Sequence, residues 1–225
     1  MDPMATLSDL VAVTAKVEGL DPGSVALYAR HMREAGLIKT SGRGTSAAVM
    51  GLPDAANLLI GVNAAKSAAE ALRAIRQFRD LHAYEFRSES DPRPESHGGA
   101  FGDAIEQLIK AAGTGKIPEP FFGTIMPDLQ EAFFNGDVHV GVTFKTTKVL
   151  VTIEIWPLPG KDAVDPDAPD RWAAQVPPSI SLLFSSPRPR GPPGAKKQKG
   201  TADRTEEVTI GYRTFREVGK LILPN

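Results

Sequence analysis

Two runs of alternating apolar residues constrain the fold of this chain more than any other feature. Apolar side chains occupy every second position from Val138 to Phe144, and the same spacing returns from Val149 to Ile155. Residues two apart lie on the same face of a strand, so each run predicts a half-buried β-strand. The KTTK sequence between the runs suggests a hairpin. The C-terminal half is therefore expected to contain an antiparallel sheet.

Other segments of this half are assigned from the same kind of pattern. SISLLF and EEVTIGYRTF are expected to form two further strands. FGDAIEQLIKAAG, PDLQEAFF and FREVGKLIL have the apolar spacing of helices. Helices and strands together with an antiparallel pair predict an α+β domain.

The N-terminal part has the clearest helix boundaries. Thr6 is placed to cap a helix from Leu7 to Glu18, with an acidic residue three positions later and a glycine just after the end. In the next helix, Asp21 is the expected cap and Pro22 the first helical residue. Gly36 suits its C-terminal stop. Two capped helices in succession therefore begin the chain.

The following elements complete a two-domain expectation. Residues 37–40 are predicted to form a short strand leading into a glycine-rich turn, and a helix is expected from Pro53–Asp54, then a longer one over residues 63–82. RSESDPRPESHGG is polar and rich in proline, serine and glycine, which is typical of a linker. The predicted organisation is a winged helix-turn-helix domain at 1–86, a linker at 87–99 and an α+β domain at 100–225.

Composition narrows the possible classes of protein. The 225 residues include no cysteine, which excludes disulfides and thiolate chemistry. The start lacks the pattern of a signal peptide and no apolar run has the length of a membrane span, so a cytoplasmic location is expected. The net charge is −1, but residues 24–45 carry four basic side chains against one acidic. A local basic patch is therefore compatible with a nearly neutral chain.

The sequence contains no motif of a known catalytic centre. SGRGTS has the wrong glycine spacing for a phosphate-binding loop, and GTGK lacks the hydroxyl residue that should follow its lysine. No HExxH or GxSxG sequence occurs. We therefore expect no catalytic residue, no metal and no cofactor. His139, in a predicted strand, is expected to be a structural residue that faces out of the sheet. A catalytic site assembled on the C-terminal sheet has no motif in its favour.

The order of elements after the first helix favours DNA binding. A helix, a short connection, a second helix ending in REAGLI and a Gly- and Arg-containing tip have the order of a helix-turn-helix followed by a wing. The two glycines beside Arg43 would let the tip approach a backbone closely. An arginine there could reach phosphate or the minor groove.

SVALYARHMREAGLIKTSGRG resembles the helix-and-wing segment of many bacterial and phage winged-helix regulators. PDAANLLIGV is similar to the helix that follows the wing in regulators of the mercury-resistance type, and the first 80 or so residues resemble prophage-associated proteins of alphaproteobacteria. The resemblance implies sequence-specific DNA binding and control of transcription. Carried onto this chain, it implies that the following residues contact DNA: Ser24, Tyr28, Arg30, His31, Arg33, Lys39, Ser41, Arg43 and Thr45. For Tyr28, packing in the core remains an equal alternative.

A second basic segment lies between two predicted strands. Its proline, glycine and lysine content is typical of a disordered, solvated loop, and such a loop can also contact phosphates without sequence preference. The candidate residues for this secondary contact are Arg188, Arg190, Lys196, Lys197 and Lys199.

The expected function is thus a sequence-specific DNA-binding transcriptional regulator that binds double-stranded DNA as a homodimer. Residues 100–225 would supply self-association or contact with a protein partner. Two alternatives remain. In the first, Arg30 and Arg33 form only the solvated face of a packing helix and do not bind DNA. The protein could also be a phage assembly or DNA-packaging adaptor that uses its N-terminal helices as a protein interface.

Overall fold

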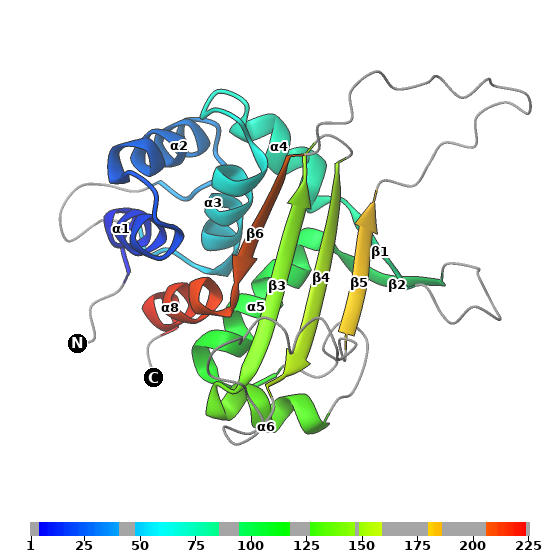
Figure 1. Ribbon diagram of the computed structural model, residues 1–225. Coiled ribbons are helices and arrows are strands. Elements are labelled where there is room, and N and C mark those ends of the chain that lie inside the picture. Colours follow the sequence, from blue (N-terminus) through cyan, green and yellow to red (C-terminus); the bar gives the residue numbers. More distant parts are fainter. Residues whose placement is uncertain are drawn as a thin grey trace, which may run out of the picture.

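One antiparallel sheet with helices packed against it forms the framework of the protein (Figure 1). The computed structural model describes residues 5–40, 48–85, 95–117, 127–146, 149–158, 180–185 and 206–223. The six strands of the sheet follow the order β2-β1-β5-β4-β3-β6. They are β1 His82–Glu85, β2 Glu95–Ala100, β3 Val138–Lys145, β4 Leu150–Pro157, β5 Ile180–Ser185 and β6 Glu207–Gly211. The predicted α+β class is confirmed.

The helices lie before, between and after these strands in the sequence. They are α1 Leu7–Glu18, α2 Pro22–Glu34, α3 Leu52–Ala64, α4 Ala71–Arg79, α5 Phe101–Thr114, α6 Pro127–Asn135 and α8 Tyr212–Ile222. Figure 1 shows α2, α1 and α8 stacked at the left of the sheet, while α5 lies behind the sheet. Helix α3 lies between β6 and the pair α1 and α2, and α8 follows directly from the end of β6. Among the described residues, no helix is long and apolar enough to cross a membrane.

The predicted hairpin forms the centre of the sheet. Val140 pairs with Ile155 and Val142 with Ile153 across β3 and β4, and all four side chains are buried. The alternation that predicted these strands therefore reflects one face turned toward the helices. His139, on the other face, is exposed, as expected.

Four phenylalanines join this sheet to helices from both halves of the chain. Phe144 of β3 lies 5.7 Å from Phe78 of α4 and 5.6 Å from Phe101 of α5, measured between ring centroids. Phe101 also contacts Phe184 of β5, at 5.3 Å. Because these rings are almost fully buried and meet edge to face or tilted, they form one continuous aromatic core.

This core crosses the predicted boundary between the two domains. Strand β1, from the segment assigned to the first domain, pairs with β5 of the second. Residues 95–99 of the predicted linker lie in β2 and pair with β1, while residues 86–94 lie outside the described part. The proline, serine and glycine content that suggested a linker is thus compatible with an edge strand, where unpaired backbone groups face solvent.

Two element predictions are wrong at their ends. The helix expected over 63–82 is α4 alone, because α3 stops at Ala64 and a turn closed by the Glu70 N–H to the Ser67 carbonyl precedes α4. The strand expected to continue through YRTF stops at Gly211, and α8 begins at Tyr212. Phe215, which the two sequence patterns place both at the end of this strand and at the start of the next helix, is a buried residue of the helix.

Helices α5 and α8 cross with their backbones in close contact at two glycines. A Cβ added to Gly113 would lie 2.6 Å from the carbonyl carbon of Gly219, which is far inside normal contact. A Cβ on Gly219 would lie 2.7 Å from the Gly113 Cα and would also strike the Ile109 carbonyl oxygen. Only glycine at both positions permits this crossing, because the obstructing atoms belong to backbone.

Substitution Gly219→Ala should therefore separate the two helices and lower the free energy of unfolding by about 1–3 kcal/mol through overpacking. Chemical denaturation of the full chain would measure the loss. Gly61→Ala in α3 is the matched control, because the added methyl there meets the flexible end of Met32. An equal loss in the two variants would contradict the importance of the backbone contact.

A polar network links the N-terminal helices to α5. The Arg79 guanidinium donates through Nη1 to Asn57 Oδ1 at 2.8 Å and through Nη2 to Glu106 Oε1 at 2.5 Å. The Asn57 amide in turn donates to the Leu37 carbonyl at 2.6 Å. Glycine at 102 leaves room for the guanidinium, since a Cβ there would lie 2.7 Å from the Arg79 Nε. The network thus connects α3, α4, α5 and the segment after α2.

Loss of the arginine should leave the Oδ1 of the buried Asn57 and the carboxylate of the half-buried Glu106 without this partner. We expect Arg79→Ala to lower the free energy of unfolding by about 1–3 kcal/mol. Arg79→Lys should recover little of this, since an ammonium cannot reproduce the planar fork. Arg76→Ala, an exposed change one turn earlier, should alter stability by no more than about 0.5 kcal/mol. Thermal and chemical unfolding of the three variants would test this order.

Candidate nucleic-acid interface

Capping interactions mark both ends of α1 and the start of α2. Thr6 and Asp9 form the predicted capping box of α1, and Gly19 ends this helix at φ 65°. Asp21 caps α2 by accepting a hydrogen bond from the Ser24 N–H at 2.7 Å. The connection between the helices is therefore three residues long and includes a glycine in the left-handed region. This length and composition are typical of a helix-turn-helix connection.

Helix α2 turns one face to the core and the opposite face to solvent. Val25, Ala29 and Met32 are buried at helical spacing against the neighbouring helices. On the outer side Leu27 is 49% exposed, which is unusual for a leucine at the middle of a helix. Ser24, Arg30 and Arg33 are exposed as well, and His31 is half-buried. The predicted contact residues on α2, apart from Tyr28 and His31, are thus exposed to solvent.

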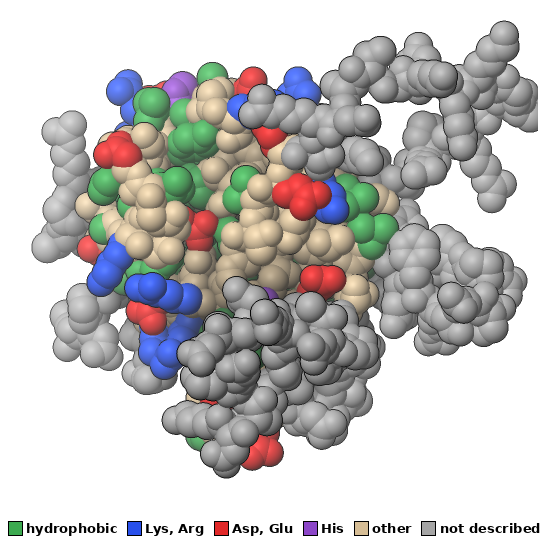
Figure 2. Space-filling model, in the orientation of Figure 1, with side chains coloured by type: hydrophobic (Ala, Val, Ile, Leu, Met, Phe, Trp, Pro, Cys, Tyr) green, Lys and Arg blue, Asp and Glu red, His purple; other side chains and the backbone are tan. Residues whose placement is uncertain are grey.

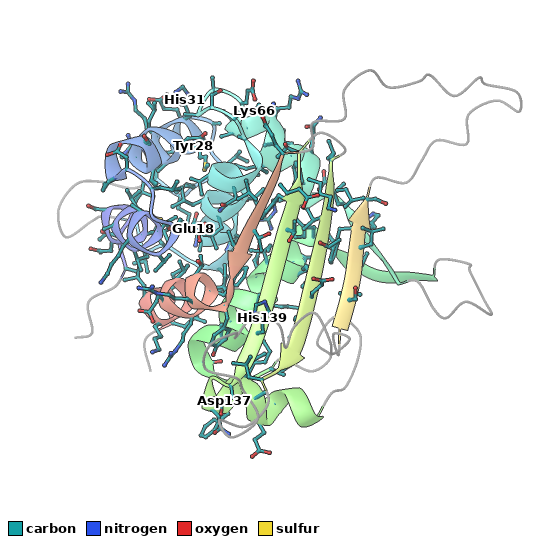
Figure 3. The ribbon with its side chains drawn as sticks, viewed as in Figure 1. Glu18, Tyr28, His31, Lys66, Asp137 and His139 are labelled. Carbon is teal, nitrogen blue, oxygen red and sulfur yellow. The ribbon has the colours of Figure 1, made fainter. Side chains whose placement is uncertain are left out.

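Tyr28 is occupied in packing. Its hydroxyl donates to the Ala65 carbonyl at 3.2 Å, and the side chain is half-buried (Figure 3). Burial, followed by the nearby Glu70 carboxylate, raises the pKa of this hydroxyl, so Tyr28 stays neutral. The sequence left core packing and base contact open for Tyr28. The structure favours packing, because it places the side chain between α2 and the connection from α3 to α4.

The two arginines of α2 differ in their surroundings. Arg30 Nε donates to Glu34 Oε1 at 2.8 Å, and this pair is well exposed. The hydrogen bond lowers the pKa of Glu34 and raises that of Arg30, so both remain charged. Arg33 has no ion pair within the described part of the chain. Arg33 is accordingly the least compensated cation on this face. The Ser24 hydroxyl, also on α2, bonds to the capping Asp21 at 3.0 Å.

The strand predicted at 37–40 does not form. The Leu37 carbonyl accepts from Asn57, and the Lys39 N–H donates to Asp54 Oδ1 at 2.9 Å. Side chains at the start of α3 therefore satisfy backbone groups that a strand would pair with another strand. The short apolar pair Leu37–Ile38 reflects burial against the helices.

Asp54 holds both flanks of the predicted wing. Besides the Lys39 N–H, its carboxylate accepts from the Gly51 N–H at 2.9 Å and lies 3.7 Å from the Lys39 ammonium. The carboxylate is almost fully buried, whereas the Lys39 side chain is 60% exposed. Lys39 and Gly51, on either side of this segment, thus meet at one carboxylate. The predicted wing residues Ser41, Arg43 and Thr45 lie outside the described residues, as do Arg188, Arg190, Lys196, Lys197 and Lys199.

The sequence did not reveal the role of Glu18, a half-buried acid at the C-terminal end of α1. Glu18 accepts a hydrogen bond from the Thr214 hydroxyl of α8 and one from the Asn63 side chain of α3 (Figure 3). Burial raises the pKa of this carboxyl, and the two hydrogen bonds oppose the rise without cancelling it. Thr214 is 196 positions away in sequence, so no local pattern could have indicated the pair.

No cluster suited to a metal ion is present: in the described ranges, no three histidine, aspartate or glutamate side chains come together as ligands would.

Comparison with protein-family models, with curated proteins and with solved structures finds no match to this chain.

The two acids of α1 should respond to pH in opposite directions. The raised pKa of Glu18 means that its ionised form is unfavourable in the folded state, so Glu18→Gln should raise the free energy of unfolding at about pH 7. The gain should disappear as the pH falls to about 3, below the ordinary pKa of glutamate, where the carboxyl is protonated in both states.

Asp9 supplies the matched control on the same helix. Hydrogen bonds from Thr6 lower the pKa of its carboxyl, so its stabilising effect is present at neutral pH and is lost as the pH falls through the lowered pKa. Asp9→Asn should lower the free energy of unfolding at about pH 7, with little effect in strong acid. Urea unfolding across this pH range would test both; the same sign for both variants would contradict the assignment.

Proposed function

We propose that this protein is a sequence-specific DNA-binding transcriptional regulator of the bacterial and phage type, with α2 as the helix that enters the major groove. The observation that carries the proposal is the capped α1–α2 pair, joined by a three-residue turn, with the outer face of α2 free of packing. In helix-turn-helix proteins the second helix of such a pair lies in the major groove.

The side chains on this face suit base recognition. Arginine is the commonest partner of guanine, so Arg33 and Arg30 would donate to base edges or phosphates. Ser24, at the start of α2, can bond to several base edges, while the exposed Leu27 would contact a thymine methyl. At about 1.5 Å per residue, the 13-residue helix is about 20 Å long, enough to follow the groove past several base pairs.

The segment between Lys39 and Gly51, whose flanks both bind Asp54, would act as the wing. Lys39 at its base is exposed and would contact a phosphate, and Arg43 would be the outermost charge of the loop. We further propose a homodimer on paired half-sites, since helix-turn-helix proteins commonly bind DNA in this way.

Substitution of the uncompensated arginine tests the proposal. Genomic fragments bound by the purified protein are first selected to obtain a target duplex. Arg33→Ala should then weaken binding to this duplex by about 1–3 kcal/mol, roughly 5- to 150-fold, and Arg30→Ala by less, because Glu34 already offsets its charge. Arg43→Ala tests the wing. Gel-shift titration would measure the three affinities, and the melting temperatures should be unchanged.

Lys145→Gln is the control, because it removes one positive charge, as each arginine variant does. This lysine lies on the sheet, where it pairs with Glu207 at 3.0 Å, and not on α2. Unaltered affinity in both Arg33→Ala and Arg43→Ala, or no enriched fragment at all, would remove the proposed site.

An adaptor for phage assembly or DNA packaging is the second candidate. The exposed Leu20 and Leu27, at 39% and 49%, favour it, because apolar side chains on neighbouring elements suit a protein interface. A ring-shaped or higher oligomer in solution, without preference for any duplex, would support the adaptor and contradict the regulator. Light scattering of the purified chain distinguishes the two.

A further inference from the structure

The C-terminal helix α8 carries a row of basic side chains on one face. Arg213, Arg216 and Lys220 are all exposed. Their spacing of three and four residues places them along one side of the helix. In Figure 2, Lys and Arg side chains gather at the lower left, where Figure 1 places α8. We call these three residues the α8 basic face.

The opposite side of α8 is fixed in the core. Phe215 and Val218 are completely buried, and Gly219 lies against the backbone of α5. The Thr214 hydroxyl bonds to Glu18 of α1. These contacts fix both the position and the rotation of the helix, so the three basic side chains must project from the molecule in one direction.

The cations of this face lack the ion pairs that other cations form among the described residues. Within the described residues none of the three forms an ion pair, whereas Lys66, Lys145 and Arg79 each pair with a glutamate. The one acid on α8, Glu217, is half-buried and pairs with none of them. The face therefore has a net positive charge that a partner could neutralise.

We infer that the α8 basic face binds the phosphate backbone of duplex DNA without regard to sequence. At about 1.5 Å per residue, Arg213 and Lys220 are about 10 Å apart along the helix axis. Each strand of a duplex carries one negative charge per about 3.4 Å of the axis, so this span faces roughly three phosphates of one strand. A row of exposed cations with no apolar side chain between them fits an extended polyanion better than an apolar partner.

This contact is separate from that of α2, although it rests on the proposed function for the identity of the partner. Helix α1 packs between α2 and α8, so the two surfaces lie on either side of it (Figure 1). The α2 surface would recognise the bases, and the α8 basic face would add affinity for any duplex. Neutralising α8 should therefore weaken binding equally for target and non-target DNA.

The salt dependence of binding tests the inference. The logarithm of the affinity falls with the logarithm of salt concentration by about 0.9 for each phosphate contact. The triple variant Arg213→Gln, Arg216→Gln, Lys220→Gln should therefore lose about 2 to 3 from the magnitude of this slope, measured by fluorescence anisotropy on a random-sequence duplex. Its ratio of target to random affinity should be unchanged. All three side chains are exposed, so the melting temperature should also be unchanged.

A control variant separates local contact from overall charge. Lys66→Gln with Lys145→Gln removes two positive charges that lie elsewhere and are already paired with Glu206 and Glu207. Its slope should equal that of the wild type. An equal loss of slope in the control, or an unchanged slope in the triple variant, would overturn the inference.

The outcomes also separate this inference from the proposed function. If Arg33→Ala lowers target affinity while the triple variant changes nothing, the regulator stands and the α8 contact falls. Absence of duplex binding at low salt would overturn both. Binding of the wild type, but not of the triple variant, to vesicles rich in anionic lipid, with DNA affinity equal in the two, would show that the face serves a membrane surface and would overturn the DNA contact.

Discussion

The guanidinium of Arg79 donates to Asn57 on α3 and to Glu106 on α5, and Asn57 continues the chain of hydrogen bonds to the Leu37 carbonyl. Each of these groups is removed from much of its water and would be costly to leave unpaired. The positions of α3, α4 and α5 are thus coupled through one side chain. Both candidate surfaces depend on this coupling, because α2 packs on α3 and α4, and α8 packs on α5.

The same coupling joins segments that composition assigned to separate domains. Phe78 from the first part meets Phe144 from the second, and β1 pairs with β5. These contacts hold the N-terminal helices in a fixed orientation relative to the sheet. If α2 and the α8 basic face both contact DNA, their separation is therefore set by the fold, and α1 is the spacer between them.

The two surfaces would divide the work of DNA recognition. Base contacts discriminate between sequences, whereas phosphate contacts give affinity and salt dependence. On α2 the arginine charge is partly offset by Glu34, which would suppress binding to arbitrary DNA. On α8 no such offset occurs among the described residues. We therefore assign sequence selectivity to α2, whose positive electrostatic field is weaker, and affinity for any duplex to α8, whose field is stronger.

Local sequence determined those elements whose signals lie within a few residues. The capping box at Thr6, the Asp21 cap with Pro22 at the first position, and the alternation in β3 and β4 were all predictable, because each depends on neighbours in the chain. The α+β class and the exposed face of α2 followed from them. Leu37–Thr40 was mistaken for a strand because two buried apolar residues look alike in a strand and in a packed connection.

Only the tertiary structure decided which distant residues meet. Asp54 on Lys39, Thr214 on Glu18, and Gly113 against Gly219 are contacts between residues far apart in the sequence, and the identity of one partner says little about the other. The α8 basic face was missed for the same reason. Assigned to a strand, Arg213 is separated from the helix that carries Arg216 and Lys220. Burial of Phe215, Val218 and Ile222 against the rest of the molecule selects the helix and brings the three cations to one side.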